Sequence, residues 1–442
     1  MARIFLQLFG CDKNRIDLEI TAYKLLKAGY ELVNDAYVAD VAIVNTCSFI
    51  ESATVESIDG IIRLVNIKQE TSSSLKAIVV MGCMSQRYMN EISEELPEVD
   101  AFIGLGNNND VVTIIEKVLN GKRVVVFSEK ENLPLNGKRM LTTPKHYAYI
   151  KIAEGCSNYC SYCVIPFIRG RFRSRSMDEI LTEAKDLVKR GVKELILIAQ
   201  DTTNYGNDLD NGSSLALLLK EIVKIKDLWK VRLLYCYGEH ITDELIDTIA
   251  REDKIAKYID IPMQHASDDI LIKMNRKSSK QQYTELISKL RARNIDIAIR
   301  STFIVGFPTE TDKDFFELLE FIKKERLARV GCFSYSKEDE TAAGRMKKQI
   351  PIEIKNRRYD MFMTVQTTIL SELQSAMISK EVEVIIDSYD KKKKLFYCRS
   401  EYDAPEIDTV IFLSSNKKLK QGDITSVRIT KSDGIDLFAE DV

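Results

Sequence analysis

Short apolar runs alternate with helical patterns through the first three quarters of the chain, and this alternation constrains the fold more than any other feature. In residues 1–130 the runs ARIFLQLFG, VADVAIVNT and LKAIVVMG are separated by patterns such as IDLEITAYKLLKAG. Strands that alternate with helices form parallel sheets, because each helix returns the chain to the edge where the next strand begins. We therefore predict a parallel-sheet α/β domain over residues 1–130.

A second alternation follows a polar linker at residues 128–145. Six strand candidates occur in it: HYAYIKIAEG, KELILIAQD, KVRLLYCY, KYIDIPMQ, IAIRSTFIVGF and ARVGCFSYS. Six βα units are too few for a complete eight-fold barrel. The sequence therefore predicts an incomplete (βα)6 barrel within residues 142–373, followed by a long amphipathic helix over about 356–378.

The last segment, residues 376–442, contains short strand patterns such as EVEVIIDSYD, LFYCRSEY and DITSVRIT, which predict a small antiparallel β-barrel. From Ile378 onward it has eleven Lys and Arg against thirteen Asp and Glu, a net charge of −2. A module that grips RNA is expected to have a basic face, so this balance favours a basic protein partner. The run KKKK at 391–394 is interpreted as a solvated hairpin turn.

The composition is that of a globular protein, with a formal net charge of −2 over 442 residues. We expect no membrane association, because no apolar run is long enough to span a bilayer. The first residues lack the apolar core of a secretory signal, so we expect the cytoplasm. Clustered cysteines in a reducing compartment more often bind metal or perform redox chemistry than form disulfides.

Three cysteines, Cys156, Cys160 and Cys163, occur in the stretch CSNYCSYC, with the spacing C-x3-C-x2-C. Structural zinc sites typically need four ligands, and the nearest histidine is His146. A four-iron cube held by three thiolates keeps one iron open for another ligand. The stretch directly follows the first predicted barrel strand, at the end where barrel enzymes place their sites. We interpret it as an iron–sulfur site that binds a substrate or cofactor.

A second set of three cysteines, Cys11, Cys47 and Cys83, is spaced at intervals of 36 residues. Each one ends an apolar run, and Gly10 and Gly82 precede two of them. The carboxyl ends of parallel strands meet at one edge of a sheet, so these three thiols are expected to converge. The remaining cysteines, Cys236, Cys332 and Cys398, are interpreted as core residues.

The cysteine spacing, with Tyr162 before the last cysteine, resembles the radical S-adenosylmethionine (SAM) superfamily. Two three-cysteine sites followed by a small β-barrel resemble the methylthiotransferases. GCDKNRIDLE (10–19), IAQDTTNYGNDL (198–209), MQHASDDILIKMNRK (263–277), FSYSKEDETAA (333–343) and DAPEIDTVIFL (403–413) look like the branch that modifies an aspartate of a ribosomal protein. The chain departs from that branch's usual pattern at Asp12, Asn275 and Thr409.

The resemblance implies two 4Fe-4S clusters and SAM as cofactors. Cys11, Cys47 and Cys83 would hold the sulfur-transfer cluster, and Cys156, Cys160 and Cys163 the radical cluster. The implied domains are an amino-terminal methylthiotransferase domain (1–130), a radical SAM core (142–373) and a TRAM domain (376–442). The implied reaction adds a methylthio group to the β-carbon of an aspartate in small-subunit ribosomal protein twelve. A flavodoxin or ferredoxin would donate electrons, and a monomer is expected.

Further residues at predicted strand ends are candidates for SAM binding: Tyr162, Gln200, Asp201, Gln264 and Arg300, with the stretch from Arg300 to Glu310. Each has the alternative interpretation of a hydrogen-bonded loop residue, and His265 alone is more often structural. The basic run RGRFRSR at 169–175 either neutralises an acidic group or forms an exposed loop.

Two other functions remain open from the sequence. A transfer RNA adenosine methylthiotransferase has the same domain order. A non-catalytic iron–sulfur or zinc protein needs only the thiols.

Overall fold

The computed structural model describes residues 2–293 and 296–442, and the chain forms two compact units. The first unit consists of three segments, Met1–Thr142, Lys151–Arg175 and Ser336–Gly344. The second consists of Thr143–Ile150, Ser176–Tyr335 and Arg345–Val442. Neither unit is therefore a single continuous stretch of the chain.

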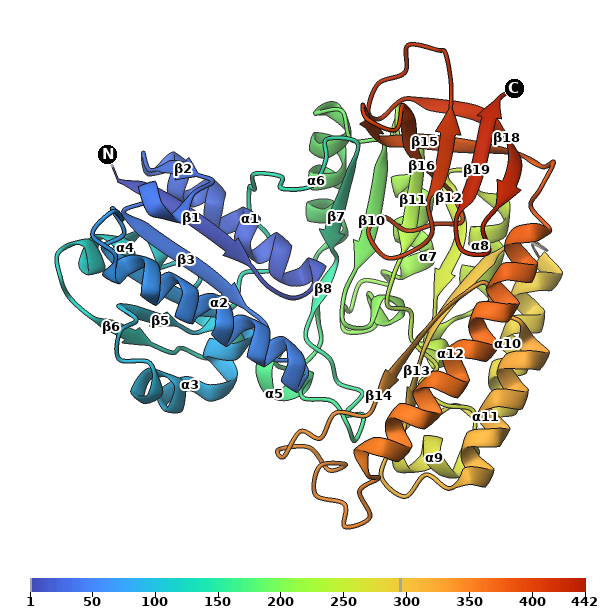
Figure 1. The fold of residues 1–442 in the computed structure, drawn as a ribbon, viewed down its shortest axis with the longest axis horizontal. Helices are drawn as coiled ribbons and strands as arrows, with labels where there is room; N and C mark the ends of the chain where they lie inside the picture. Colours follow the sequence, from blue (N-terminus) through green and yellow to red (C-terminus); the bar gives the residue numbers. More distant parts are fainter. Residues whose placement is uncertain (1, 294–295) are drawn as a thin grey trace. The chain divides into compact units, whose positions relative to one another are not determined.

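The first unit is built on a six-stranded parallel sheet in the order β2-β1-β3-β4-β5-β6 (Figure 1). Its strands are β1 (Arg3–Leu8), β2 (Glu31–Val33), β3 (Val41–Thr46), β4 (Ala77–Gly82), β5 (Ala101–Ile103) and β6 (Val124–Val126). Its longer helices are α1 (Asp12–Lys27), α2 (Glu51–Gln69), α3 (Cys83–Glu95) and α4 (Val111–Leu119). The predicted parallel-sheet α/β fold is confirmed.

Both faces of this sheet are buried, which explains why its central strands are continuously apolar. Val41 and Ile43 face a core that includes residues of α1 and α4. The alternate residues Ala42 and Val44 face a second core with residues of α2 and α3. Short elements complete the unit: η1 (Ala36–Val38), η2 (Leu105–Asn107), η3 (Lys130–Asn132), β8 (Ala153–Glu154), α5 (Ile165–Arg169) and β9 (Arg173–Ser174).

The predicted linker is anchored to the first unit. Arg139, which is 5% exposed, donates to Glu19 on α1 over 2.5 Å. The backbone and hydroxyl of Thr142 donate to the same carboxylate over 2.7 and 2.8 Å. The polar composition of the segment therefore reflects buried ionic contacts as well as solvent exposure.

The second unit contains the predicted six-stranded sheet, in the order β14-β13-β12-β11-β10-β7. These strands are β7 (Tyr147–Lys151), β10 (Glu194–Ile198), β11 (Lys230–Leu233), β12 (Ile255–Asp260), β13 (Ala298–Val305) and β14 (Arg329–Ser334). The helices are α6 (Met177–Lys189), α7 (Leu215–Ile222), α8 (Asp243–Arg251), α9 (Asp268–Lys273), α10 (Lys280–Arg293) and α11 (Asp312–Glu325), with η4 (Thr202–Asn204) and η5 (Gly238–His240). Five of these strands lie within the runs that predicted them, and β12 begins two residues before its run KYIDIPMQ.

The long helix α12 spans Ile352–Ser375, so it begins and ends a few residues earlier than predicted. It starts directly after Pro351, whose fixed φ suits the residue that opens a helix. At its carboxyl end the helix stops earlier than predicted because Ala376 is the capping residue, after which the chain turns toward the next strand.

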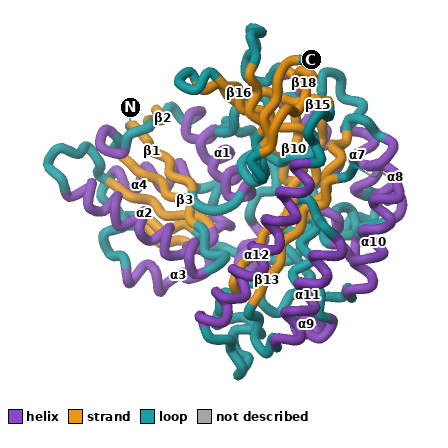
Figure 2. The backbone as a smooth tube through the Cα atoms, turned by 45° about the vertical axis from the view of Figure 1, so that its right-hand side comes forward, coloured by secondary structure: helices purple, strands orange, loops and turns teal. Residues whose placement is uncertain are grey.

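The carboxyl-terminal strands form a closed five-stranded barrel in the order β15-β16-β17-β19-β18 (Figure 2). They are β15 (Glu381–Asp390), β16 (Leu395–Ser400), β17 (Ile411–Ser414), β18 (Ile424–Ser432) and β19 (Leu437–Asp441). All pairs are antiparallel except β17 with β19. The four lysines at 391–394 form the exposed turn between β15 and β16, as predicted.

Buried ion pairs connect this barrel to the parallel sheet within the second unit. Arg399 of β16 donates to Glu194 of β10 over 2.8 Å, and Arg232 of β11 donates to the other oxygen of Glu194 over 2.7 Å. Burial alone would raise the pKa of Glu194, but the two guanidinium groups outweigh it and hold that pKa below its usual range. The barrel is therefore an integral part of the second unit.

None of the helices within the described residues is both long and apolar enough to cross a lipid bilayer.

Candidate functional site

Cys11, Cys47 and Cys83 follow three neighbouring strands of the first unit's sheet. Cys11 directly precedes α1, Cys47 follows β3, and Cys83 is the first residue of α3, after β4. Because β1, β3 and β4 are adjacent and parallel, the three positions meet at one edge of the sheet. The structure brings the thiols within electrostatic range of one another.

Two glycines allow these backbones to approach closely. Gly10 has a φ of +91°, and a Cβ there would lie 2.7 Å from Cβ and 2.9 Å from Sγ of Cys47. Gly82 has a φ of +100°, and a Cβ there would lie 2.6 Å from the carbonyl oxygen of Thr46. Only glycine adopts such conformations without strain. The two glycines therefore permit close packing of the chain beside Cys47 and Thr46.

Asn14, in the first turns of α1, connects the elements that carry the three cysteines. Its Nδ2 donates to the carbonyl oxygens of Phe9 and Thr46, both at 3.0 Å. Its Oδ1 accepts from Sγ of Cys83 at 3.4 Å. Asn45 in turn donates to the carbonyl oxygen of Asn14 over 2.8 Å. This fully buried amide therefore fixes how the three strand ends meet.

The second cysteine set lies in a loop of the first unit that is closed at its base. The short strands β8 and β9 pair antiparallel, and the backbone N–H of Cys156 donates to the carbonyl oxygen of Gly170 over 3.1 Å. The N–H of Cys163 donates to the carbonyl of Cys160 over 3.0 Å. Burial raises the pKa of the Cys163 thiol, and the neighbouring thiols of Cys160 and Cys156 raise it further. The loop therefore brings the three thiols of CSNYCSYC together.

A segment from much later in the chain also contacts this loop within the first unit. Ala343 donates its N–H to the carbonyl oxygen of Ser161 over 2.8 Å. Arg87 of α3 donates to Glu338 over 2.8 Å and to Glu340 over 2.5 Å. The side chains of Arg87 and Glu338 are 6% and 7% exposed. Ion pairs therefore hold residues 336–344 against α3, and a backbone hydrogen bond connects them to the cysteine loop.

Four buried charges lie in the first unit, on α1 and on the segment that carries the cysteine loop. Lys151 donates to Asp17 over 2.7 Å and to Glu154 over 2.6 Å. Arg169 donates to Glu154 over 3.0 Å, to Asp17 over 3.1 Å and to Asn14 over 2.5 Å. Burial alone would raise the pKa of Glu154, but Arg169 and Lys151 outweigh it and hold that pKa well below its usual range. We call Asp17, Lys151, Glu154 and Arg169 the ionic quartet.

The quartet was missed by sequence reasoning, except that Arg169 opens the basic run RGRFRSR. The run is not a uniformly exposed loop: Arg169 and Arg175 are 1% and 4% exposed, whereas Arg171 is exposed. Arg175 donates to the carbonyl oxygen of Lys151 over 2.8 Å. The exposed-loop alternative is therefore wrong for Arg169 and Arg175.

The donor chemistry suits iron–sulfur cubes. None of the nine cysteines, all within the described chain, forms a disulfide. No three His, Cys, Asp or Glu side chains among residues 2–293 and 296–442 converge as ligands of a single metal ion. A cube spreads its thiolates over different irons, so its ligands lie farther apart than those of one ion. Each set of three thiols, at one edge of the sheet or in a closed loop, fits such a group.

The candidate SAM-binding residues at strand ends lie in the second unit. Asp201, after β10, is 1% exposed and accepts from Thr203 over 2.9 Å and from the N–H of Asn204 over 3.2 Å. Its other oxygen lies 2.9 Å from Nδ1 of His240, and this hydrogen bond raises the pKa of His240. Gln200, directly before Asp201, is partly exposed.

Two backbone conformations mark the ends of the neighbouring strands. Gln264, after β12, has a φ of +72° and forms an isolated parallel bridge with Phe303. Tyr235, after β11, has a φ of +60°, and its N–H donates to Asp260 over 2.9 Å. Left-handed backbone at residues other than glycine concentrates at functional sites. Sequence reasoning missed Tyr235, because a backbone angle leaves no mark in the residue type.

The remaining candidates are placed as follows. Arg300 is the third residue of β13, so the expectation that it lies at the carboxyl end of a strand is wrong; it lies 3.0 Å from Asp260 and 3.6 Å from Asp408. Tyr162 is partly buried in the cysteine loop of the first unit. His265 is fully buried and accepts from the N–H of Ser267, and burial lowers its pKa to about 3, which agrees with a structural role.

The isolated cysteines Cys236, Cys332 and Cys398 are 0%, 6% and 0% exposed, as expected for core residues.

Comparison with known protein families assigns most of the chain. Residues 150–322 match the radical SAM superfamily, and residues 3–104 match the uncharacterized protein family UPF0004. Residues 378–442 match the TRAM domain. These matches define a radical SAM enzyme, whose class uses SAM and a 4Fe-4S cluster.

Curated relatives cover nearly the whole chain. The ribosomal protein uS12 methylthiotransferase RimO of Thermoanaerobacter sp. (strain X514) is 47% identical over 98% of both chains. The protein of the same name from Clostridium botulinum (strain Eklund 17B / Type B) is 45% identical, over 97% of this chain and 96% of that one. The chain therefore belongs to the RimO family of ribosomal protein methylthiotransferases, and the resemblance drawn from its motifs is confirmed.

Solved structures support the fold alone. The radical SAM methyltransferase TsrM of Kitasatospora setae, solved with cobalamin and a [4Fe-4S] cluster, aligns with a TM-score of 0.58 at 16% identity, over 78% of this chain and 77% of that one. The cobalamin-dependent radical enzyme OxsB aligns with a TM-score of 0.51 at 15% identity, over 83% of this chain and 56% of that one.

Proposed function

We propose that this enzyme transfers a methylthio group to the β-carbon of one aspartate of ribosomal protein uS12, using two 4Fe-4S clusters and SAM. The observation that carries the proposal is that both three-cysteine sets belong to one compact unit, beside the ionic quartet. The names of the relatives support the substrate. The terminal barrel's net charge of −2 also suits a basic protein better than a polyanion.

In this proposal Cys156, Cys160 and Cys163 hold the radical cluster, and Cys11, Cys47 and Cys83 hold the sulfur-transfer cluster. When bound, the clusters and SAM supply the radical chemistry that an unactivated carbon–hydrogen bond requires. Three thiolates leave one iron of each cube open to a further ligand. Gly10 and Gly82 allow the chain to pack closely beside Cys47 and the end of β3.

The protein's own groups orient the reactants. Tyr162, Gln200, Asp201, Gln264 and Arg300 are proposed to position SAM. The hydrogen bonds to Asp201 fix its carboxylate, and the pairing with Asp260 fixes the guanidinium of Arg300. Because these groups are already oriented before SAM binds, the free-energy cost of ordering them does not arise in each reaction cycle.

The proposal includes the setting of the reaction. Residues 1–130 serve sulfur transfer, residues 142–373 radical formation and residues 376–442 substrate contact. A flavodoxin or ferredoxin supplies the electrons, and the enzyme acts as a monomer in the cytoplasm, where ribosomal proteins are made.

Two triple variants test the cluster assignment. Replacing Cys156, Cys160 and Cys163 with Ala should abolish SAM cleavage and leave about half of the iron, because each set of thiolates binds its own cube. Replacing Cys11, Cys47 and Cys83 should preserve SAM cleavage but stop methylthio transfer. SAM cleavage that survives in the first variant contradicts the assignment.

Mass spectrometry of uS12 tests the substrate. The protein from cells that contain this gene should have one more methylthio group, on a single aspartate, than the protein from cells that lack it. An unchanged uS12 together with loss of a methylthio-adenosine from transfer RNA would establish the transfer RNA activity instead.

A further inference from the structure

Arg169 is one of the most buried charged side chains in the first unit. It is the last residue of α5 and follows Cys163 by six residues, and 1% of its surface is exposed. Its Nη1 donates to Glu154, and its Nη2 donates to Asn14 and Asp17. The segment that carries one cysteine set therefore inserts a permanent positive charge beside α1, which begins directly after Cys11.

The guanidinium also reaches the thiols of the other set. It is close enough to the thiols of Cys83, Cys11 and Cys47 to interact with them electrostatically. Asn14 Oδ1 accepts from both Arg169 and Cys83, so the amide holds the charge and the thiol at the same point. Arg169 is thus part of the surroundings of the Cys11, Cys47 and Cys83 site.

Lys151, which lies 2.7 and 2.6 Å from the quartet's two carboxylates, Asp17 and Glu154, balances one of their negative charges, and Arg169 balances the other. Charge balance alone does not require a guanidinium where a second ammonium would serve. The planar guanidinium extends the network to Asn14, whose Oδ1 also accepts from Cys83. A buried charge acts strongly over short distances, because little water screens it.

We propose that Arg169 is a positioning residue for the amino-terminal cluster, and that its positive charge stabilises the reduced, more negative state of that cluster. The segment that holds the radical cluster thereby sets the reduction potential of the sulfur-transfer cluster. This inference rests on the proposed function, in which Cys11, Cys47 and Cys83 hold a cluster.

The test uses the full chain with Cys156, Cys160 and Cys163 replaced by Ala, so that the cluster observed is the amino-terminal one. Its reduction potential is measured by redox titration with electron paramagnetic resonance. Arg169→Gln should lower the potential by at least 59 mV, a tenfold change in the one-electron equilibrium. Arg169→Lys keeps the charge and should retain most of the potential. Arg171→Gln, an exposed change in the same run, is the matched control and should leave it unchanged.

A second variant covers the case in which Arg169→Gln does not fold. Asp17→Asn removes a negative charge from the same network, so it should raise the potential. A potential that stays at the control value in Arg169→Gln or, if that protein does not fold, in Asp17→Asn overturns this inference alone. A parent variant that binds no iron overturns the two-cluster assignment instead, and this inference with it.

Discussion

Replacing Asn14 with Ala tests whether this amide holds the amino-terminal site together. The variant loses the donors to the carbonyl oxygens of Phe9 and Thr46, each at 3.0 Å in a buried setting. A buried polar group left without its partner costs about 1–3 kcal/mol, so the two together cost roughly 2–6 kcal/mol. This is a large fraction of the roughly 5–15 kcal/mol that stabilises a typical domain.

Hydrogen exchange of the metal-free protein, followed by mass spectrometry, measures this loss. Because about 1.4 kcal/mol corresponds to a factor of ten, the amides of β1, β3 and β4 should exchange at least ~30-fold faster in the variant. The strands β10 to β13 of the second unit are the internal reference. Lys27→Ala, an exposed change on the same helix, is the matched control and should stay within about 0.5 kcal/mol of the parent. Equal protection in the Asn14 and Lys27 variants would refute the role assigned to Asn14.

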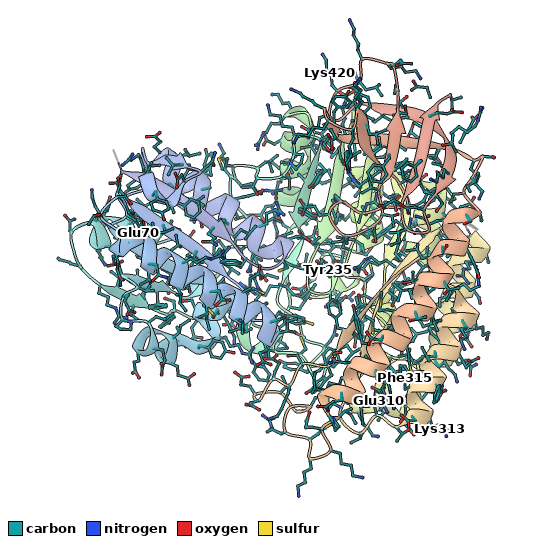
Figure 3. The ribbon with its side chains drawn as sticks, viewed as in Figure 1. Glu70, Tyr235, Glu310, Lys313, Phe315 and Lys420 are labelled. Atoms are coloured by element: carbon teal, nitrogen blue, oxygen red, sulfur yellow. The ribbon has the colours of Figure 1, made fainter. Side chains whose placement is uncertain are left out.

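Three further changes have definite expected results. Glu310, near Phe315 at the amino end of α11 (Figure 3), has its pKa raised from 4.5 to about 7 by burial, despite Arg358. The native state therefore keeps this proton at pH values where the unfolded chain releases it, so the free energy of unfolding should fall between pH 4.5 and 7. The fall in the free energy of unfolding between pH 4.5 and 7, measured by thermal unfolding, should be smaller by up to roughly 3 kcal/mol in Glu310→Gln. An unchanged pH dependence contradicts the argument. Arg87→Met leaves the carboxylate of Glu338 buried without its cation, at a cost of roughly 3 kcal/mol, and limited proteolysis should then cut within 336–344; resistance equal to the parent's counts against the contact. Gly10→Ala places a methyl group 2.7 Å from Cβ of Cys47 at a φ of +91°, a strain of about 1–3 kcal/mol, and should lower the iron bound per chain. Full iron binding by Gly10→Ala would show that the backbone can shift to accommodate the methyl group.

The sequence predicted the strands of the two parallel sheets well because several of them are buried along their whole length. VAIVNT in β3 is apolar at its first four positions, and all six residues are buried. Parallel pairing then determines where Cys11, Cys47 and Cys83 lie, since residues that end adjacent strands meet at one edge. The convergence of these three cysteines could therefore be predicted from their regular spacing in the chain.

The ionic quartet and its neighbours could not be predicted in this way. Asn14 and Arg169 are 155 residues apart, and no periodic pattern connects them. The sequence does not distinguish a buried arginine from an exposed one. The run RGRFRSR therefore does not show that Arg169 is buried and Arg171 is exposed. The ion pair between Glu19 and Arg139 in the predicted linker is similar, because its energy comes from burial that only the folded chain defines.

The three-segment composition of the first unit has a consequence for the order in which the protein is made. All six cysteines of the two sets are synthesised by residue 163, but the unit also needs Ser336–Gly344, which binds Arg87 and Ser161. A ribosome releases the amino-terminal segments first, so they must wait for most of the second unit to be translated. Iron delivered to the nascent chain would meet thiols in an unfinished unit. In the proposed function, loading of the two clusters would then belong to the last stage of synthesis or follow it.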